Sequence, residues 1–158
     1  MNGVEVRRIA LIAAACVLAL SPASAQVPAG EFSFSSVTSG SWRYRAVAGG
    51  SEATFVDTTG TARMAISCGR VTRLVTLSRI SAAPASSLSL WTSSATRNLG
   101  ATFDQRSRRV IAQVSSNDAL LDAIAFSRGR FALSMPGFPA LVLPAGPEIA
   151  HVVEDCRA

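Results

Sequence analysis

The stretch "PEIAHVVEDC", residues 147–156, decides how the end of this chain packs. On a helix its apolar side chains fall at positions i, i+3, i+4 and i+7 and share one face: Ile149, Val152, Val153 and Cys156. Pro147 suits the first helical turn, because the N–H that proline lacks has no partner there. The stretch therefore predicts a helix that buries its cysteine.

The other side of this helix carries Glu148, His151 and Asp155, around the only histidine of the chain. A Glu and a His three residues apart bind metal in di-iron bundles, but only together with further inward-facing carboxylates from other helices. Here the apolar face must turn inward, so the three polar side chains are expected to face water. We therefore predict no metal site, no cofactor and no catalytic residue here.

The N-terminus has the pattern of an export signal. Arg7 and Arg8 precede the apolar run "IALIAAACVLAL", residues 9–20, and Ala23-Ser24-Ala25 matches a cleavage site. The run is shorter than the roughly 20 residues that cross a membrane. We expect residues 1–25 to be a cleaved signal peptide, the mature chain to begin at Gln26 without a transmembrane segment, and the protein to be periplasmic or secreted.

Removal of the signal peptide would leave two cysteines, Cys68 and Cys156, in an oxidising compartment. Two cysteines in an exported domain of this size are most simply one disulfide. Such a bond would close a loop of about 88 residues and stabilise the fold by roughly 4–5 kcal/mol at most. The alternative is two buried free thiols.

The body of the chain predicts strands. Residues 26–41 are a Ser/Gly/Pro-rich lead-in with a possible short strand at Phe32 and Phe34, and a single disulfide-linked domain spans 42–158. Short segments with alternating or β-branched patterns follow at 42–47, 53–56, 63–68, 70–80, 87–93, 96–104 and 109–115. Trp42, Tyr44 and Trp91 are expected to be the most exposed aromatic residues.

The C-terminal third changes period. Residues 116–127, "SNDALLDAIAFS", have capping residues and helical spacing, and strands are expected at 129–135 and 140–143 before the terminal helix. The expected fold is mostly β: an antiparallel meander, either a sandwich or a partly open barrel, with two short helices in the C-terminal third, on the borderline of α+β.

Several chemistries are excluded by composition. The chain has no lysine, so it has no Schiff-base or phosphate-loop lysine, and it has no Gly-x-Ser-x-Gly motif. A small secreted hydrolase using a serine and His151 is the alternative to a non-catalytic role. We expect the latter, a binding or accessory module.

The arginines are what remains in excess, in a chain of net charge +5. We take six of them as a possible surface for an anionic partner: Arg70, Arg73, Arg97, Arg106, Arg108 and Arg109. Export argues against nucleic acid, so the expected partner is an envelope protein or an anionic component of the cell envelope. The alternative is ordinary solvated surface charge.

Four stretches carry a resemblance to known proteins: "SWRY", "RMAISC", "LLDAIAFSRGRFAL" and "LPAGPEIAHVVEDCR". From Trp42 onward the chain resembles a group of small uncharacterised exported proteins of alphaproteobacteria. Its order of helix, Gly turn, strand and terminal cysteine is also similar to the invasion-associated locus B family, which is exported and β-rich. The resemblance implies export, a disulfide and a non-enzymatic domain, and it carries over no active site.

Overall fold

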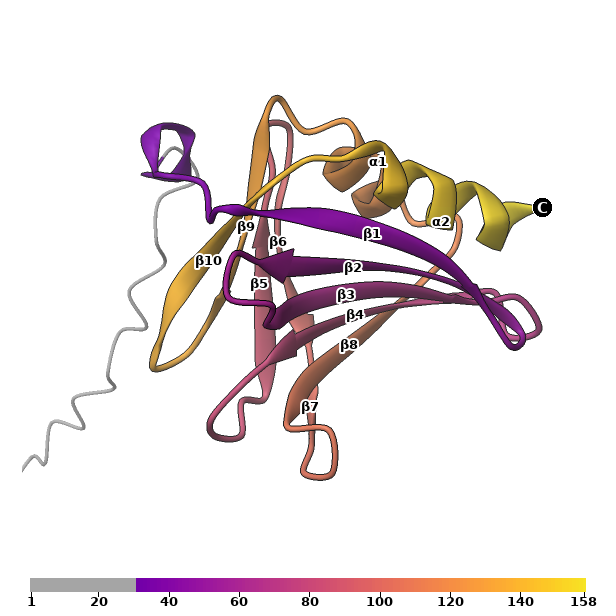
Figure 1. Ribbon diagram of the computed structural model, residues 1–158, viewed down its shortest axis with the longest axis horizontal. Coiled ribbons are helices and arrows are strands. Elements are labelled where there is room, and N and C mark those ends of the chain that lie inside the picture. Colours follow the sequence, from indigo (N-terminus) through magenta and orange to yellow (C-terminus); the bar gives the residue numbers. More distant parts are fainter. Residues whose placement is uncertain (1–30) are drawn as a thin grey trace, which may run out of the picture.

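The computed structural model describes residues 31–158, which form two antiparallel sheets and two helices (Figure 1). The predicted signal peptide and the expected start at Gln26 lie outside the described residues. The elements in chain order are η1 (Glu31–Phe34), β1 (Gly40–Val47), β2 (Gly50–Asp57), β3 (Ala62–Gly69), β4 (Leu74–Ile80), β5 (Ser87–Trp91), β6 (Thr96–Gly100), β7 (Thr102–Asp104), β8 (Arg109–Ser115), α1 (Ala119–Ala125), β9 (Arg130–Met135), β10 (Phe138–Pro144) and α2 (Pro147–Arg157).

The larger sheet has six strands in the order β1-β2-β3-β4-β8-β7. Its first four strands follow one another as antiparallel hairpins, as the spacing of short strands predicts. The smaller sheet has the order β10-β9-β5-β6. The mostly β, antiparallel prediction is thus confirmed, and between sandwich and barrel the described residues show two separate sheets and no closed barrel.

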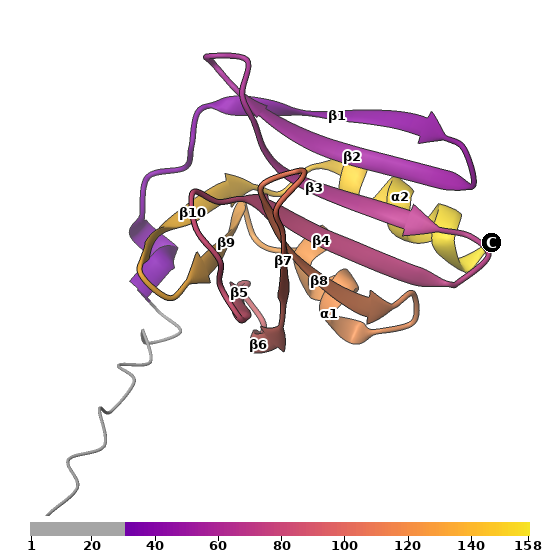
Figure 2. The ribbon, with the colours of Figure 1, turned by 90° about the horizontal axis from the view of Figure 1, so that it is seen from below.

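Both helices lie on one side of the six-stranded sheet. The terminal helix α2 contacts β1, β2, β3, β4 and α1. Figure 2 views the sheet from its other side, with α1 and α2 behind it and no helix in front. The inward side chains of the strands meet α2 and the smaller sheet in one core, whose largest fully buried members include Phe55, Phe131, Met64, Ile66, Leu77 and Leu121.

The predicted face of α2 is the buried one. Ile149, Val152, Val153 and Cys156 are all buried. Met64, Ile66 and Cys68 share the core-facing side of β3, so the two cysteines approach one another. A disulfide joins Cys68 to Cys156, with 5.4 Å between their Cα atoms. The bond confirms the predicted pairing and fastens the last helix to the centre of the six-stranded sheet.

Four local predictions are wrong. The expected strand over residues 96–104 is two strands, β6 in the smaller sheet and β7 in the larger one. The expected short strand at Phe32 and Phe34 is a 3₁₀ helix. The expected strand over residues 70–80 begins only at Leu74, because residues 70–73 form a turn in which Arg73 adopts a left-handed φ of 55°. Trp42 and Trp91 are buried, at 8% and 7% exposure, since each ring packs against other aromatic rings.

Candidate functional site

The six arginines expected to bind an anion do not gather on one surface. Arg70 and Arg73 lie in the turn between β3 and β4, beside the pair Gly69 and Leu74. The turn with Arg106 and Arg108 joins β7 to β8 and lies at the opposite end of the sheet, where Ile80 pairs with Arg109. These positions make two separate ends of one sheet rather than a single patch.

The side chain of Arg73 bonds to the end of helix α2. Its guanidinium donates to the main-chain carbonyls of Cys156 and Arg157, at 3.2 and 2.8 Å. The last carbonyls of a helix have no partner within the helix, and its C-terminus favours positive charge. Arg73 therefore caps the C-terminus of α2.

Arg97 also bonds within the fold. It lies on β6 and forms an ion pair of 2.5 Å with Asp118, the N-cap of α1, whose carboxylate also accepts from the N–H of Leu120 at 2.9 Å. The guanidinium holds the pKa of Asp118 below its usual value. The pair orients the capping side chain of α1, so its role is structural.

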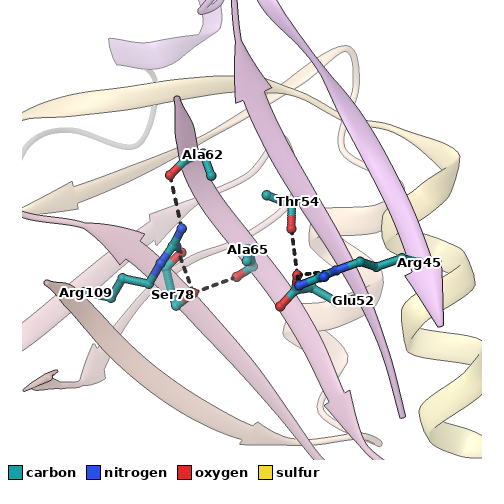
Figure 3. A network of polar contacts seen from close by, with 7 residues as sticks. All are labelled: Arg45, Glu52, Thr54, Ala62, Ala65, Ser78 and Arg109. Carbon is teal, nitrogen blue, oxygen red and sulfur yellow. Dashed lines mark hydrogen bonds and ion pairs between the residues drawn. The ribbon is translucent and has the colours of Figure 1, made fainter. Parts of the chain in front are cut away.

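Arg109 is half-buried on the side of the six-stranded sheet that no helix covers (Figure 3). It donates to the carbonyl of Ala62 at 3.1 Å and to the hydroxyl of Ser78 at 3.2 Å. These contacts hold three strands in place. Arg70, Arg106 and Arg108 are exposed, and Arg70 lies 3.9 Å from Asp155.

We call the uncovered side of the larger sheet the open face. Because side chains alternate along a strand, register places one polar row across it, composed of Arg45, Glu52, Ser67, Thr76 and Gln113. Arg43 and Thr54 belong to the next row. The open face is thus polar across five strands. The alternation of polar residues along each strand carries this signal, but the sequence-based prediction did not include it.

Contacts within the open face are short and local. Arg45 donates to Glu52 at 2.7 Å, and Thr54 donates to the same carboxylate oxygen at 2.9 Å (Figure 3). Gln113 donates to Thr76 at 3.2 Å. Arg43 is exposed and has no ion pair with any residue between 31 and 158. The face presents donors and acceptors from rigid strands.

The histidine belongs to a second cluster, on the other side of the sheet. The imidazole of His151 stacks on the ring of Tyr44, with 4.0 Å between centroids and an angle of 6°. The Tyr44 hydroxyl donates to Asp155 at 2.6 Å, and His151 lies 3.9 Å from the same carboxylate. The expectation that these groups face water is therefore only partly right: His151 is exposed, but Asp155 is half-buried and accepts a hydrogen bond from Tyr44.

The chemistry of this cluster is that of a packing contact. The hydrogen bond from Tyr44 is the main cause that lowers the pKa of Asp155, and the same bond raises the pKa of Tyr44. Both groups are thereby held in their ordinary states near neutral pH. His151 contacts the Tyr44 ring and Asp155, and neither group is a hydroxyl or thiol nucleophile of the kind that a histidine base activates.

Between residues 31 and 158 no three His, Cys, Asp or Glu side chains are grouped so that they could hold a metal ion. Within the same range, no helix has the length and apolar character needed to cross a membrane.

Comparison with known proteins identifies no relative: no family model, no curated protein and no solved structure matches this chain.

Proposed function

We propose that this chain is an exported, non-catalytic domain that uses its open face to bind an envelope protein bearing acidic groups. One observation carries the proposal: the six-stranded sheet turns an uncovered polar face outward, while every helix in residues 31–158 packs elsewhere. Arg43 and Arg45 lie on that face at its β1 edge, and the planar guanidinium group suits carboxylates.

The composition of the open face favours a polar, reversible interface. Its centre holds hydroxyl and amide side chains rather than large apolar ones, as in interfaces that retain water. The ion pair of Arg45 with Glu52 is exposed, so it contributes little to stability, and Arg45 can exchange Glu52 for a partner's carboxylate. Contacts of this kind weaken as salt rises.

Two features support export and a non-catalytic role. A disulfide persists in oxidising compartments such as the periplasm, and the N-terminal sequence has the pattern of a cleaved signal. A hydrolase using His151 would need a nucleophile beside it, and the histidine instead stacks on Tyr44. His151→Ala should therefore leave the biological phenotype of the protein unchanged.

Site-specific crosslinking in the native envelope tests the proposal. A photo-crosslinking residue replaces Gln113, which is exposed on the open face, and in a control it replaces Glu154, which is exposed on α2. We expect one defined product from position 113 at low salt, much less of it at high salt, and none from position 154.

Charge reversal identifies the groups responsible. The double change Arg43→Glu with Arg45→Glu should abolish the product, whereas Arg106→Glu with Arg108→Glu, at the far turn, should leave most of it. Equal products from positions 113 and 154, or a yield indifferent to salt and to Arg43 and Arg45, would contradict binding through the open face.

A further inference from the structure

A cleft of about 690 Å³ lies away from the open face, between the β5–β6 turn, the segment that leads into β9, and η1. Its walls include Ser33, Trp91, Ser94, Arg128 and Arg130. Ligand pockets span about 300–1,000 Å³, so the cleft has room for a small molecule. None of its lining residues is acidic, so two guanidinium groups share it without a carboxylate.

The cleft is held by a set of hydrogen bonds between its two turns. The buried Ser127 hydroxyl accepts from the N–H of Ser93 at 3.0 Å and donates to the carbonyl of Arg130 at 2.5 Å. The Ser93 hydroxyl accepts from the N–H of Arg128 at 2.9 Å. The segments that carry the hydroxyls and the arginines are thus fastened to each other.

The third wall of the cleft is η1, and two contacts hold it in place. The guanidinium of Arg130 donates to the carbonyl of Ser35, and the ring of Phe32 packs on Trp91 with 5.9 Å between centroids. These two contacts place η1, and with it Ser33, at the cleft. Residues that the sequence suggested as a lead-in therefore complete one wall.

Arg128 lines the cleft with a guanidinium group that the fold does not use. Its side chain is exposed, and its guanidinium has no hydrogen bond or ion pair with residues 31–158. Gly129, at a left-handed φ of 75°, makes the tight turn between Arg128 and Arg130. A guanidinium beside hydroxyl groups matches the oxygens of a phosphate or sulphate, which accept several hydrogen bonds at once.

We propose that this cleft binds a phosphate or sulphate group carried by a small hydroxylated molecule. Arg128 and Arg130 supply the charge, and Ser33, Ser94 and Thr96 supply hydroxyl groups for the rest of the ligand. The cleft exceeds the size of a single oxyanion, which is why an ester fits it better than the free ion. This site is distinct from the open face and does not depend on the protein partner proposed above.

Amide NMR titration of the disulfide-bonded protein tests this site, with glucose 6-phosphate, glucose and inorganic phosphate as probes. We expect glucose 6-phosphate to shift the Trp91 indole and the amides of Ser94 and Arg128, inorganic phosphate to do so more weakly, and glucose not at all. Arg128→Gln should weaken the binding of glucose 6-phosphate at least tenfold. The matched control, Arg106→Gln, removes an exposed arginine at a distant turn and should leave binding within twofold of wild type.

Four results would overturn the assignment. Glucose binding as tightly as its phosphate would remove the role of the anion, and equal losses in the Arg128 and Arg106 variants would reduce it to general surface charge. No shift with any probe at millimolar concentration would show that the cleft is not a site. Inorganic phosphate binding as tightly as the ester would contradict recognition of the hydroxylated part.

Discussion

The guanidinium of Arg79, on β4 of the larger sheet, donates a 2.7 Å hydrogen bond to the main-chain carbonyl of Leu133, on β9 of the smaller sheet. A second bond of 2.6 Å reaches the carbonyl of Pro139 on β10. Burial, with a smaller effect of the charge on Arg63, lowers the pKa of Arg79 to about 10, so the group stays charged at neutral pH. A buried cation thus joins the two sheets through carbonyl dipoles.

Arg79→Met should lower the free energy of unfolding by about 2–4 kcal/mol, because the carbonyls of buried Leu133 and of exposed Pro139 both lose a charged donor. Urea denaturation at pH 7 measures the change. Arg45→Met is the control: it removes an exposed ion pair and should cost less than about 1 kcal/mol. Equal stabilities of the Arg79 variant and wild type would show that relief of the buried charge offsets both hydrogen bonds.

The disulfide predicts matched losses from two distant positions. Cys68→Ser and Cys156→Ser should each lower the free energy of unfolding by up to about 4–5 kcal/mol, because either change removes the same crosslink. Thermal unfolding of both variants and of the reduced wild type measures this. A large difference between the two variants would mean that side-chain packing, rather than the crosslink, dominates the effect.

Export predicts a defined mass. Protein recovered from the periplasm or the medium should have the intact mass of residues 26–158 less two hydrogens. Reduction and alkylation should then add two alkyl groups. A mass that includes residues 1–25, or native protein that takes up alkyl groups without reduction, would contradict export or the bond.

Gly50 lies where a side chain cannot fit. A Cβ atom at this position would come within 1.8 Å of the Cys68 carbonyl oxygen, on the neighbouring strand β3. Gly50→Ala should therefore cost more than about 2 kcal/mol, since backbone on β2 or β3 must move. Gly100→Ala is the matched control in an edge strand, where a Cβ meets nothing within 4 Å, and should change stability by at most about 0.5 kcal/mol. Similar losses in urea denaturation would contradict a close approach at Gly50.

The parts of the fold that were predictable are those with a strong local period. The helical face of α2 and the alternation of Met64, Ile66 and Cys68 follow from spacing alone, and together they brought the two cysteines to the core. The turn at residues 70–73 was missed because β-branched residues continue the strand pattern through it. Its conformation depends on tertiary contacts, among them the bonds from Arg73 to the end of α2.

The arginines were harder to interpret for the same reason. Spacing shows how many there are but not which carbonyl or carboxylate each one meets. Arg73, Arg97 and Arg109 find partners more than 20 residues away along the chain, and such partners leave no local signal. The cleft at Arg128 was likewise hidden, since it unites segments around residues 33, 93 and 128.

Tyr44 and Asp155 predict a specific dependence of stability on pH. The Tyr44 hydrogen bond is the main cause of the lowered pKa of Asp155, with smaller effects from Ser51, His151 and Arg70. A carboxylate with a lowered pKa in the folded state contributes stability that is complete above its unfolded pKa of about 3.9 and is lost as pH falls through the folded value. Tyr44→Phe keeps the ring against His151 but removes the hydroxyl, so the pKa of Asp155 should return toward its usual value.

The variant should therefore be less stable than wild type at pH 7 and at pH 5, and the gap should narrow below about pH 4 as Asp155 is protonated in both proteins. Urea denaturation at pH 7, 5, 3 and 2.5 measures the gap. The carboxyl groups of Asp57, Asp104 and Asp118 also have a lowered pKa. They are present in both proteins, so their effects on stability cancel in the difference. In an Asp155→Asn background the pH dependence of the gap should disappear. A gap that stays constant from pH 7 to 2.5 would mean that Tyr44 stabilises α2 through its ring alone.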